Sequence, residues 1–308
     1  METLRAILPD KVRQALHQIP LSQIYELRLR ANAPVIACVD GRNIPLRSVD
    51  ITTEDLDNII HKAAEYAIYA VLDQMVKGFI TIRGGVRIGI AGELVTERGQ
   101  VVAVKNISSL CVRIPHEIKN CACAVIPYLF DLQRPISTLL VAPPGAGKTT
   151  LLRDLARQIG QKYPSLNTLL LDERGELAAC YQGEKQLDVG SNCDVITGGS
   201  KAYGFENGIR SLRPDVIITD EIATAEDAAM LQRAVRSGVV VMASVHAADL
   251  SEVRAKPDLG SLIEQGVFER YVVLRTGEHA GEVVGIYNRG LQRLWTGGWP
   301  AVGLSRVF

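Results

Sequence analysis

The second half of the chain contains short apolar runs separated by longer segments with helical periodicity. Five of these runs are residues 138–142, 168–171, 216–219, 239–243 and 271–274. They show no alternation of polar and apolar positions, which indicates strands that are buried on both faces. Strands of this kind, alternating with helices, predict a parallel sheet that is covered by helices on both sides. We therefore predict an α/β domain over residues 121–308.

The first 120 residues follow another pattern and predict a smaller α+β domain. Apolar positions spaced by three and four residues favour a helix over residues 52–72, which Thr52 and Asp55 would open as a capping box. A shorter amphipathic helix is expected over residues 9–19. Two hairpins are predicted, one pairing residues 33–39 with 43–47 around Asp40-Gly41 and one pairing 78–83 with 86–92 around Gly84-Gly85.

Composition narrows the class of protein without identifying it. Hydrophobic residues make up 47% of the 308 residues, and 34 basic residues balance 34 acidic ones. A zero net charge gives no support for broad electrostatic binding, so we expect no stable nucleic-acid partner. No run approaches the ~18 apolar residues of a spanning helix, and the six cysteines lack metal-ligand spacing. We expect a cytoplasmic protein without a transmembrane segment, which would reach a membrane only through partner proteins.

A phosphate-binding loop follows the first apolar run of the second half. The segment Ala142-Pro143-Pro144-Gly145-Ala146-Gly147-Lys148-Thr149 lies between that run and a helix expected over residues 148–159. This is the context of a P-loop, in which backbone N–H groups converge on phosphate oxygens at a helix N-terminus. Ala142 replaces the usual first glycine, which is tolerable if its φ is negative. The residues expected to hold ATP are Pro144, Gly145, Ala146, Gly147, Lys148, Thr149 and Thr150.

Carboxylates at a second strand end predict the magnesium-binding and water-activating groups. Asp220 and Glu221 follow the run 216–219, and ligands of α/β sheets bind outside this end of the strands. We expect Thr149 and Asp220 to bind Mg²⁺ and Glu221 to be the base that orients the attacking water. Lys148 would reach the β- and γ-phosphates. An acidic pair after a strand is also a common helix N-cap, and its position alone leaves both readings open.

Two further strand ends carry candidate catalytic residues. Glu173 lies in the acidic stretch after the second apolar run, and His246 closes a later one. His246 could face the γ-phosphate or be a structural histidine. Arg210 and Arg213 shortly precede the Asp220 strand, so they would line the same cleft or serve as charges at a helix C-terminus.

These four sites together resemble the secretion ATPases of type II, type IV pilus and type IV systems. The shared order is a phosphate loop, an acidic box, a strand ending in a carboxylate and a histidine box, and residues 209–246 are especially similar. The resemblance implies a RecA-like P-loop fold and magnesium-dependent ATP hydrolysis. It also implies a homo-oligomer, namely a hexamer. The catalytic residues would be Lys148, Glu173, Glu221 and His246.

The N-terminal half narrows the resemblance to one family. Residues 26–30, 82–87 and 107–115 look like the family of stage III sporulation protein AA, as does the acidic box 172–176. This family resemblance implies an ATPase in the mother cell of an endospore former. It would power a secretion-like channel toward the forespore, together with the membrane proteins of that complex.

The residues alone leave two other classes of protein open. A nucleic-acid-dependent motor would share the core but would need a basic groove or stacking aromatics, and aromatic residues are only 5% of the chain. A scaffold that binds ATP without turnover would have no use for Glu221. Arg83, Arg87 and Arg113 could complete the site of a neighbouring subunit, as N-domain arginines of secretion ATPases do, or be solvated hairpin charges.

Overall fold

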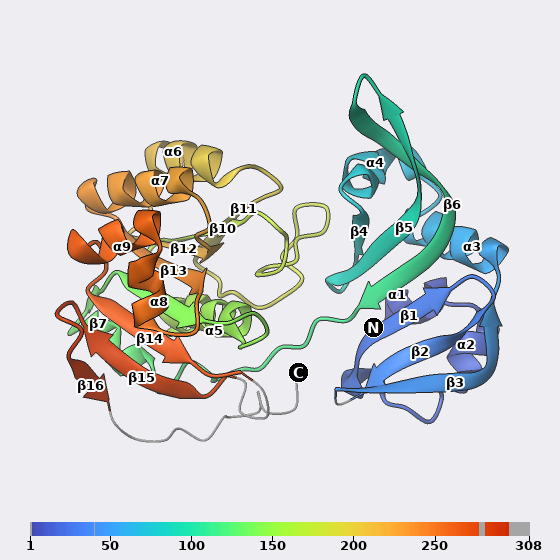
Figure 1. The fold of residues 1–308 in the computed structure, drawn as a ribbon, viewed down its shortest axis with the longest axis horizontal. Coiled ribbons are helices and arrows are strands. Elements are labelled where there is room, and N and C mark those ends of the chain that lie inside the picture. Colours follow the sequence, from blue (N-terminus) through green and yellow to red (C-terminus); the bar gives the residue numbers. More distant parts are fainter. Residues whose placement is uncertain (1, 40, 277–280, 296–308) are drawn as a thin grey trace. The chain divides into compact units, whose positions relative to one another are not determined.

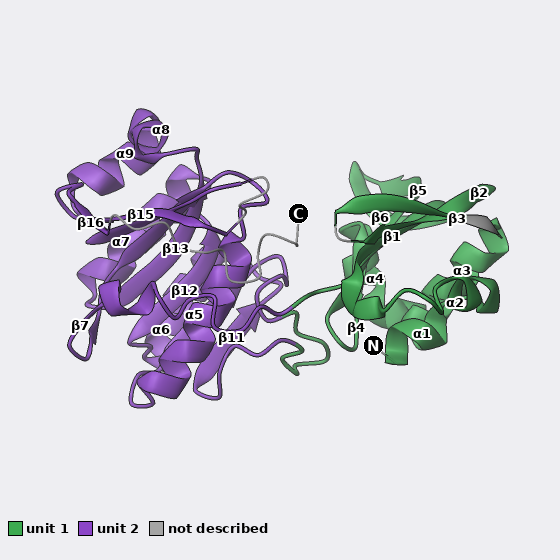
Figure 2. Cartoon of the chain, turned by 90° about the horizontal axis from the view of Figure 1, so that it is seen from below, with its two compact units in different colours: residues 1–116, 179–186 green, residues 117–178, 187–308 purple. Residues whose placement is uncertain are grey.

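The structure, a computed structural model, describes residues 2–39, 41–276 and 281–295 (Figure 1). The chain forms two compact units, coloured separately in Figure 2. Unit 1 comprises residues 1–116 and 179–186, and unit 2 comprises residues 117–178 and 187–308. The backbone therefore passes between the units three times, and a short segment from the middle of unit 2 belongs to unit 1.

Unit 1 is a six-stranded antiparallel sheet of order β3-β2-β1-β6-β5-β4, with helices against one face (Figure 2). Side chains alternate along the strands, so Leu27 and Leu29 are buried in the core while Arg28 and Arg30 are exposed. The elements are α1 (Glu2–Ile7), α2 (Asp10–Ala15), β1 (Ile24–Arg30), β2 (Ala33–Val39), β3 (Arg42–Ile51), α3 (Thr53–Ala63), α4 (Ile68–Val76), β4 (Phe79–Ile82), β5 (Val86–Glu97) and β6 (Gln100–Arg113).

The single helix expected over residues 52–72 is wrong, because two helices occupy this region. α3 ends at Ala63, and Glu65 and Tyr66 then take left-handed φ values of 51° and 61°. The turn redirects the chain so that α4 packs on β4 and β6. Apolar spacing continues across the turn, so periodicity could not reveal the break. The Thr52–Asp55 capping box is present, and the helix expected over residues 9–19 is the shorter α2.

Both predicted hairpins are present. β2 pairs with β3 and β4 pairs with β5, each antiparallel. β3 and β5 extend beyond the expected ranges to Ile51 and Glu97. Asp40, expected in the first turn, lies outside the described residues. The second turn contains Gly84 and Gly85, both with positive φ, which glycine adopts without steric cost.

Unit 2 contains an eight-stranded sheet of order β11-β10-β12-β13-β9-β14-β15-β16. The five strands expected from the apolar runs are present, and neighbours from β11 to β14 are parallel. β15 and β16 add an antiparallel edge that the sequence analysis missed, as it missed β11. The strands are β7 (Phe130–Asp131), β8 (Arg134–Pro135), β9 (Thr138–Ala142), β10 (Thr168–Asp172), β11 (Cys193–Thr197), β12 (Val216–Glu221), β13 (Val240–His246), β14 (Arg270–Leu274), β15 (Val283–Asn288) and β16 (Arg293–Trp295).

Helices cover the sheet of unit 2 on both faces. One hydrophobic core joins alternate sheet residues to α6, α7 and α9, and none of its described members lies on α5. α5 contacts β9 to β13, so it covers the opposite face. Within the described parts of the chain, no helix is both long and apolar enough to cross a bilayer. The helices are α5 (Lys148–Lys162), α6 (Lys201–Leu212), α7 (Ala225–Arg236), α8 (Leu250–Ala255) and α9 (Pro257–Glu264).

Two glycines set how closely α6 lies against the sheet. A Cβ at Gly204 would come within 2.8 Å of a Leu171 methyl, and one at Gly208 within 2.4 Å of a Leu169 methyl. Both distances are too short for real contacts, so the approach of α6 to β10 depends on the absence of side chains here. The same packing places Lys201, the first residue of α6, near the carboxyl end of β10.

Candidate active site

Parallel pairing in unit 2 brings the phosphate loop and two strand ends to one edge of the sheet. β13 lies between β9 and β12 and pairs with both. His246 is opposite Ala142, and Ser244 is opposite Glu221. Three segments that are far apart in sequence are therefore adjacent at the carboxyl ends of their strands, where ligands of open α/β sheets bind.

The phosphate loop has the backbone conformation that its sequence predicts. Gly145 and Gly147 have φ values of 75° and 82°, in the left-handed region. Ala142 is the last residue of β9 and is not among the residues with positive φ, so the missing first glycine introduces no strain. Lys148 begins α5, and Thr149 and Thr150 lie partly exposed in its first turn.

The ammonium group of Lys148 donates hydrogen bonds to acceptors within the protein. Its Nζ lies 2.9 Å from the carbonyl oxygens of Ala142 and Pro143 and 2.8 Å from Nδ1 of His246. Burial lowers the pKa of Lys148 to about 8, against the opposing effect of the Glu221 carboxylate. The lysine is thus held at the loop by three acceptors, where an arriving phosphate would compete for its protons.

His246 connects Lys148 to Glu221. Its Nε2 lies 3.2 Å from Oε2 of Glu221. Burial and the Lys148 ammonium lower the pKa of His246, so the imidazole is neutral near pH 7. Because Lys148 has only protons to offer, Nδ1 accepts and Nε2–H donates to Glu221. Three of the predicted catalytic residues are therefore linked by direct contacts.

Asp220 has an environment that fits a cation ligand. Burial raises its pKa to about 6, against the opposing effect of Lys201. Its Oδ1 is buried and has no hydrogen-bond partner within the described parts of the chain. An unpaired carboxylate oxygen is a typical ligand of Mg²⁺, which prefers hard oxygen donors. Thr149 and Asp220 are the residues that would hold this ion.

Asp172 and Glu173, in the acidic box at the end of β10, make different kinds of contact. Asp172 is fully buried and accepts the backbone N–H groups of Glu176, Leu177 and Ala178 at 2.8–3.0 Å. This fixes the loop that carries Glu173 and Arg174. Oε2 of Glu173, a predicted catalytic residue, lies 3.4 Å from Nζ of Lys201. Glu173 is therefore connected to Asp220 through the ammonium of Lys201.

Sequence reasoning missed two cations of the site. Arg174 lies inside the acidic box, and its guanidinium is 3.5 Å from Oε2 of Glu221. Lys201 lies near Glu173 and Asp220 although it is distant from both in sequence. Arg174 was visible as a basic residue inside an acidic motif. Lys201 follows β11, whose sequence Cys-Asp-Val-Ile-Thr lacks the continuous apolar run of the predicted strands.

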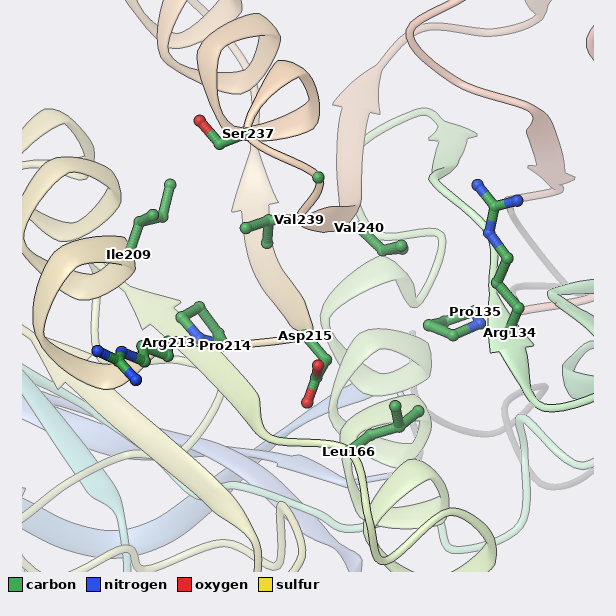
Figure 3. Close-up of a pocket in the computed structure, with 11 residues that line it drawn as sticks. Arg134, Pro135, Leu166, Ile209, Arg213, Pro214, Asp215, Ser237, Val239 and Val240 are labelled. Carbon is green, nitrogen blue, oxygen red and sulfur yellow. The ribbon is translucent and has the colours of Figure 1, made fainter.

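Arg210 and Arg213 do not line this cleft, and the other reading is confirmed, since both lie at the C-terminal end of α6. Arg210 is exposed on α6 and pairs with Glu206 at 3.2 Å. Arg213 is the C-cap residue of α6 and precedes β12, whereas Glu221 ends that strand. A pocket of about 420 Å³ near the starts of β12 and β13 is lined by residues that include Arg213 and Asp215. Figure 3 shows Arg213 next to Pro214 at this pocket. The strand length separates it from the phosphate loop.

The three N-terminal arginines lie in unit 1 with different surroundings. The Arg87 guanidinium stacks over the Phe79 ring at 3.6 Å from its centroid. Arg113 ends β6 and lies 3.6 Å from Glu26. Arg83 is exposed at the turn between β4 and β5. Two of the three therefore have local structural partners.

The segment 179–186 packs on the hairpin that carries Arg83. Gly84 donates its N–H to Oε1 of Gln186 at 2.7 Å, and Tyr181 donates its hydroxyl proton to Glu65 at 2.7 Å. A Cβ at Gly85 would come within 3.0 Å of the Ala179 side chain. The continuation of the acidic box is therefore a structural part of unit 1.

Comparison with known proteins identifies the family. A family model described as "Sporulation stage III, protein AA" matches residues 1–294. The chain belongs to this family. Stage III sporulation protein AA of Bacillus subtilis (strain 168) is 37% identical over 295 residues, covering 94% of this chain and 95% of the relative. The protein ycf45 of Porphyra purpurea is 23% identical over 268 residues, covering 85% of this chain and 43% of that protein.

Solved ATPase structures share the fold of this family member. The ATPase DotB of Legionella pneumophila has a TM-score of 0.58 at 17% identity, over 86% of this chain and 76% of that one. The pilus retraction motor PilT with bound ADP has a TM-score of 0.58 at 18% identity, over 85% and 76%. The expected P-loop ATPase fold is thereby confirmed, as is the resemblance to the sporulation family.

Proposed function

We propose that this protein is a magnesium-dependent ATPase that drives a secretion-like complex during sporulation. Membership of the sporulation family supports the biological setting, and the fold supports a motor of the secretion ATPase kind. ATP would bind with its phosphates at residues 144–150, and Mg²⁺ would supply positive charge at the phosphate oxygens.

The linked groups Lys148, His246 and Glu221 carry this proposal. Lys148 places a positive charge at the phosphate loop. Glu221 lies on β12, beyond the intervening β13, and its Oε2 contacts His246 and Arg174, as a water-positioning carboxylate requires. A scaffold that only bound ATP would have no need for this chain of contacts, and it is the reason we favour turnover.

We also propose an assembly and a location. The protein would work as a homo-oligomer, a hexamer by its likeness to secretion ATPases, in the mother cell. It would be peripheral to a membrane and bound there by channel proteins of the secretion-like complex. A native mass measurement in ATP tests the first part, because a monomer under all conditions contradicts a ring motor.

Two substitutions separate nucleotide binding from hydrolysis. Lys148→Ala removes the charge that contacts the phosphates, so ATP binding should weaken at least tenfold, about 1.4 kcal/mol. Glu221→Gln keeps size and most contacts but removes the carboxylate, so ATP should still bind while hydrolysis falls roughly 100-fold or more. Binding is measured with a fluorescent ATP analogue and hydrolysis by phosphate release.

The same assay tests the competing classes of protein. Single-stranded DNA should leave the rate of ATP hydrolysis unchanged. Stimulation of hydrolysis by the DNA would instead indicate a nucleic-acid-dependent motor. Wild-type protein that binds ATP without releasing phosphate would be a scaffold. Wild-type hydrolysis in Glu221→Gln would show that another residue orients the water.

A further inference from the structure

Lys201 is a buried lysine at the acidic end of the site. Its side chain is 8% exposed, and its Nζ lies 3.4 Å from Glu173, 3.7 Å from Asp220 and 3.9 Å from Asp227. It also donates to the main-chain carbonyl oxygen of Glu221. A buried ammonium is stable only where nearby groups compensate its charge. Here the compensation comes from the ends of β10 and β12 and from the first turn of α7.

The helix fixes the position of this ammonium. Ser200 caps α6 by accepting the N–H of Tyr203 at 3.3 Å, and Lys201 is the first residue after the cap. Gly204 and Gly208 hold α6 close to β10, as described above. Lys201 therefore projects from a well-anchored helix end, unlike a mobile surface lysine.

Carboxylates outnumber the cations around Lys201, where Arg174 supplies a second positive charge near Asp220. Three carboxylates, those of Glu173, Asp220 and Asp227, lie within 4 Å of one ammonium. Among the described residues these carboxylates do not form a group of three or more ligands that could hold a metal ion by itself, but each carboxylate oxygen is a hard donor of the kind that Mg²⁺ prefers. Oδ1 of Asp220 is 3.7 Å from the ammonium and has no hydrogen bond among the described residues. The ammonium compensates this oxygen without hydrogen bonding to it.

We propose that Lys201 is a positioning residue that acts as an internal counter-cation of the nucleotide-free site. Its ammonium holds the carboxylates together and prevents a free divalent cation from binding at Oδ1 of Asp220. Charge repulsion at this distance is strong in a buried site, so the ion binds well only when nucleotide phosphates add negative charge. This inference rests on the proposed magnesium–nucleotide site. A divalent cation would consequently enter the site together with ATP and not before it.

Divalent cation binding without nucleotide tests the role of Lys201. Mn²⁺ binding to the nucleotide-free protein is measured from the EPR signal of free Mn²⁺, with Mg²⁺ as competitor. Lys201→Met should bind one Mn²⁺ per chain at least about tenfold more tightly than wild type, because a repelling charge is gone. Lys201→Arg should behave as wild type. Lys119→Met, at an exposed lysine that pairs with Asp188, should also leave Mn²⁺ binding unchanged.

The ion is located by a second substitution. Adding Asp220→Asn to Lys201→Met should remove the gained Mn²⁺ binding. Because no nucleotide is present, the Mn²⁺ measurement does not depend on ATP binding or turnover. Absence of ATP binding or turnover in the wild-type protein would contradict the proposed function and not the role of Lys201. If Lys201→Met does not fold, Lys201→Gln, which can still donate to the Glu221 carbonyl, replaces it with the same expectation. Mn²⁺ affinity equal to wild type in the folded Lys201 variant, or an equal gain in Lys119→Met, would overturn the proposal.

Discussion

Lys148 meets its three acceptors inside the protein, and one of them is His246. A phosphate that attracts Lys148 would take a donor from Nδ1 of His246, and the other ring nitrogen of this residue contacts Glu221. The state of the phosphate loop would thus be relayed to the Glu221 carboxylate through one imidazole. We propose that His246 senses the γ-phosphate and is not merely a packing residue.

The first residue-scale prediction concerns His246→Ala. Turnover should fall roughly 10–100-fold, because the link between Lys148 and Glu221 is lost. The side chain is 35% exposed, so the melting temperature without nucleotide should change little. Phosphate release and thermal unfolding are measured on the same preparation, with His61→Ala, at an exposed position of α3, as the control. Normal specific activity with a large drop in melting temperature would assign His246 to packing.

Asp220→Asn should stabilise the nucleotide-free protein while abolishing magnesium-dependent hydrolysis. The folded pKa of Asp220, about 6, is above its ordinary 3.8, so ionisation opposes folding. The loss of unfolding free energy that ionised Asp220 causes is absent below pH 3.8, grows between pH 3.8 and 6, and is complete above pH 6. This loss amounts to roughly 1–3 kcal/mol.

Urea unfolding at two pH values checks the Asp220→Asn prediction. The substitution should raise the free energy of unfolding at pH 8 and have little effect near pH 4. An equal effect at both values would mean that the charge of Asp220 is not the cause.

Elements position the site more than any single residue does. Three parallel strands set the phosphate loop, His246 and Glu221 side by side, and α6 carries Lys201 to the acidic end. The loop after β10 has no regular structure of its own. It is held by the carboxylate of Asp172, and the positions of Glu173 and Arg174 depend on it.

At the scale of this loop, we predict that Asp172→Asn weakens both stability and catalysis. The amide retains one acceptor oxygen but places an NH₂ group against backbone N–H donors. Losing part of three hydrogen bonds to a charged acceptor should cost about 2 kcal/mol of unfolding free energy. Turnover should fall severalfold, because Glu173 and Arg174 are displaced. Asp194→Asn on β11, whose side chain is exposed, is the matched control and should alter neither. Unchanged stability in Asp172→Asn would contradict this anchoring role.

The whole molecule consists of two units that the backbone joins at three places. One connection leads from the acidic box directly into the segment 179–186, which packs on the Arg83 hairpin. We propose that unit 1 completes the catalytic site of a neighbouring subunit with an arginine. Arg83 is the strongest candidate, since it is exposed at a turn while Arg87 stacks on Phe79 and Arg113 lies beside Glu26.

A mixing experiment tests shared sites at the scale of the assembly. Arg83→Ala, Arg87→Ala and Arg113→Ala are each assayed alone and after mixing with Lys148→Ala. Arg83→Ala should lose most activity, since arginines supplied in this way accelerate phosphoryl transfer by roughly 10³–10⁵ in known GTPases. Mixing with Lys148→Ala should restore part of it, because some sites then combine an intact loop with an intact arginine. Normal hydrolysis by all three variants alone would exclude an arginine from unit 1.

Local sequence determined five strands of the unit 2 sheet and the chemistry of the phosphate loop. Continuous apolar runs mark buried parallel strands, and glycines at positions 145 and 147 allow the backbone turn, because both effects act within a few residues. The capping box at Thr52 and the turn at Gly84-Gly85 were predictable for the same reason. The motifs that resemble those of secretion ATPases made Lys148, Glu221 and His246 candidate site residues.

Tertiary structure alone decided how these groups interact. The contact of His246 with Lys148 and Glu221 depends on strand order, and the burial of Asp220 that raises its pKa depends on packing. The break between α3 and α4 and the place of Lys201 follow from long-range packing as well. A sequence pattern reports the local backbone preferences and the face of an element. Which elements become neighbours, and so which charges meet, is determined by burial of the whole sheet.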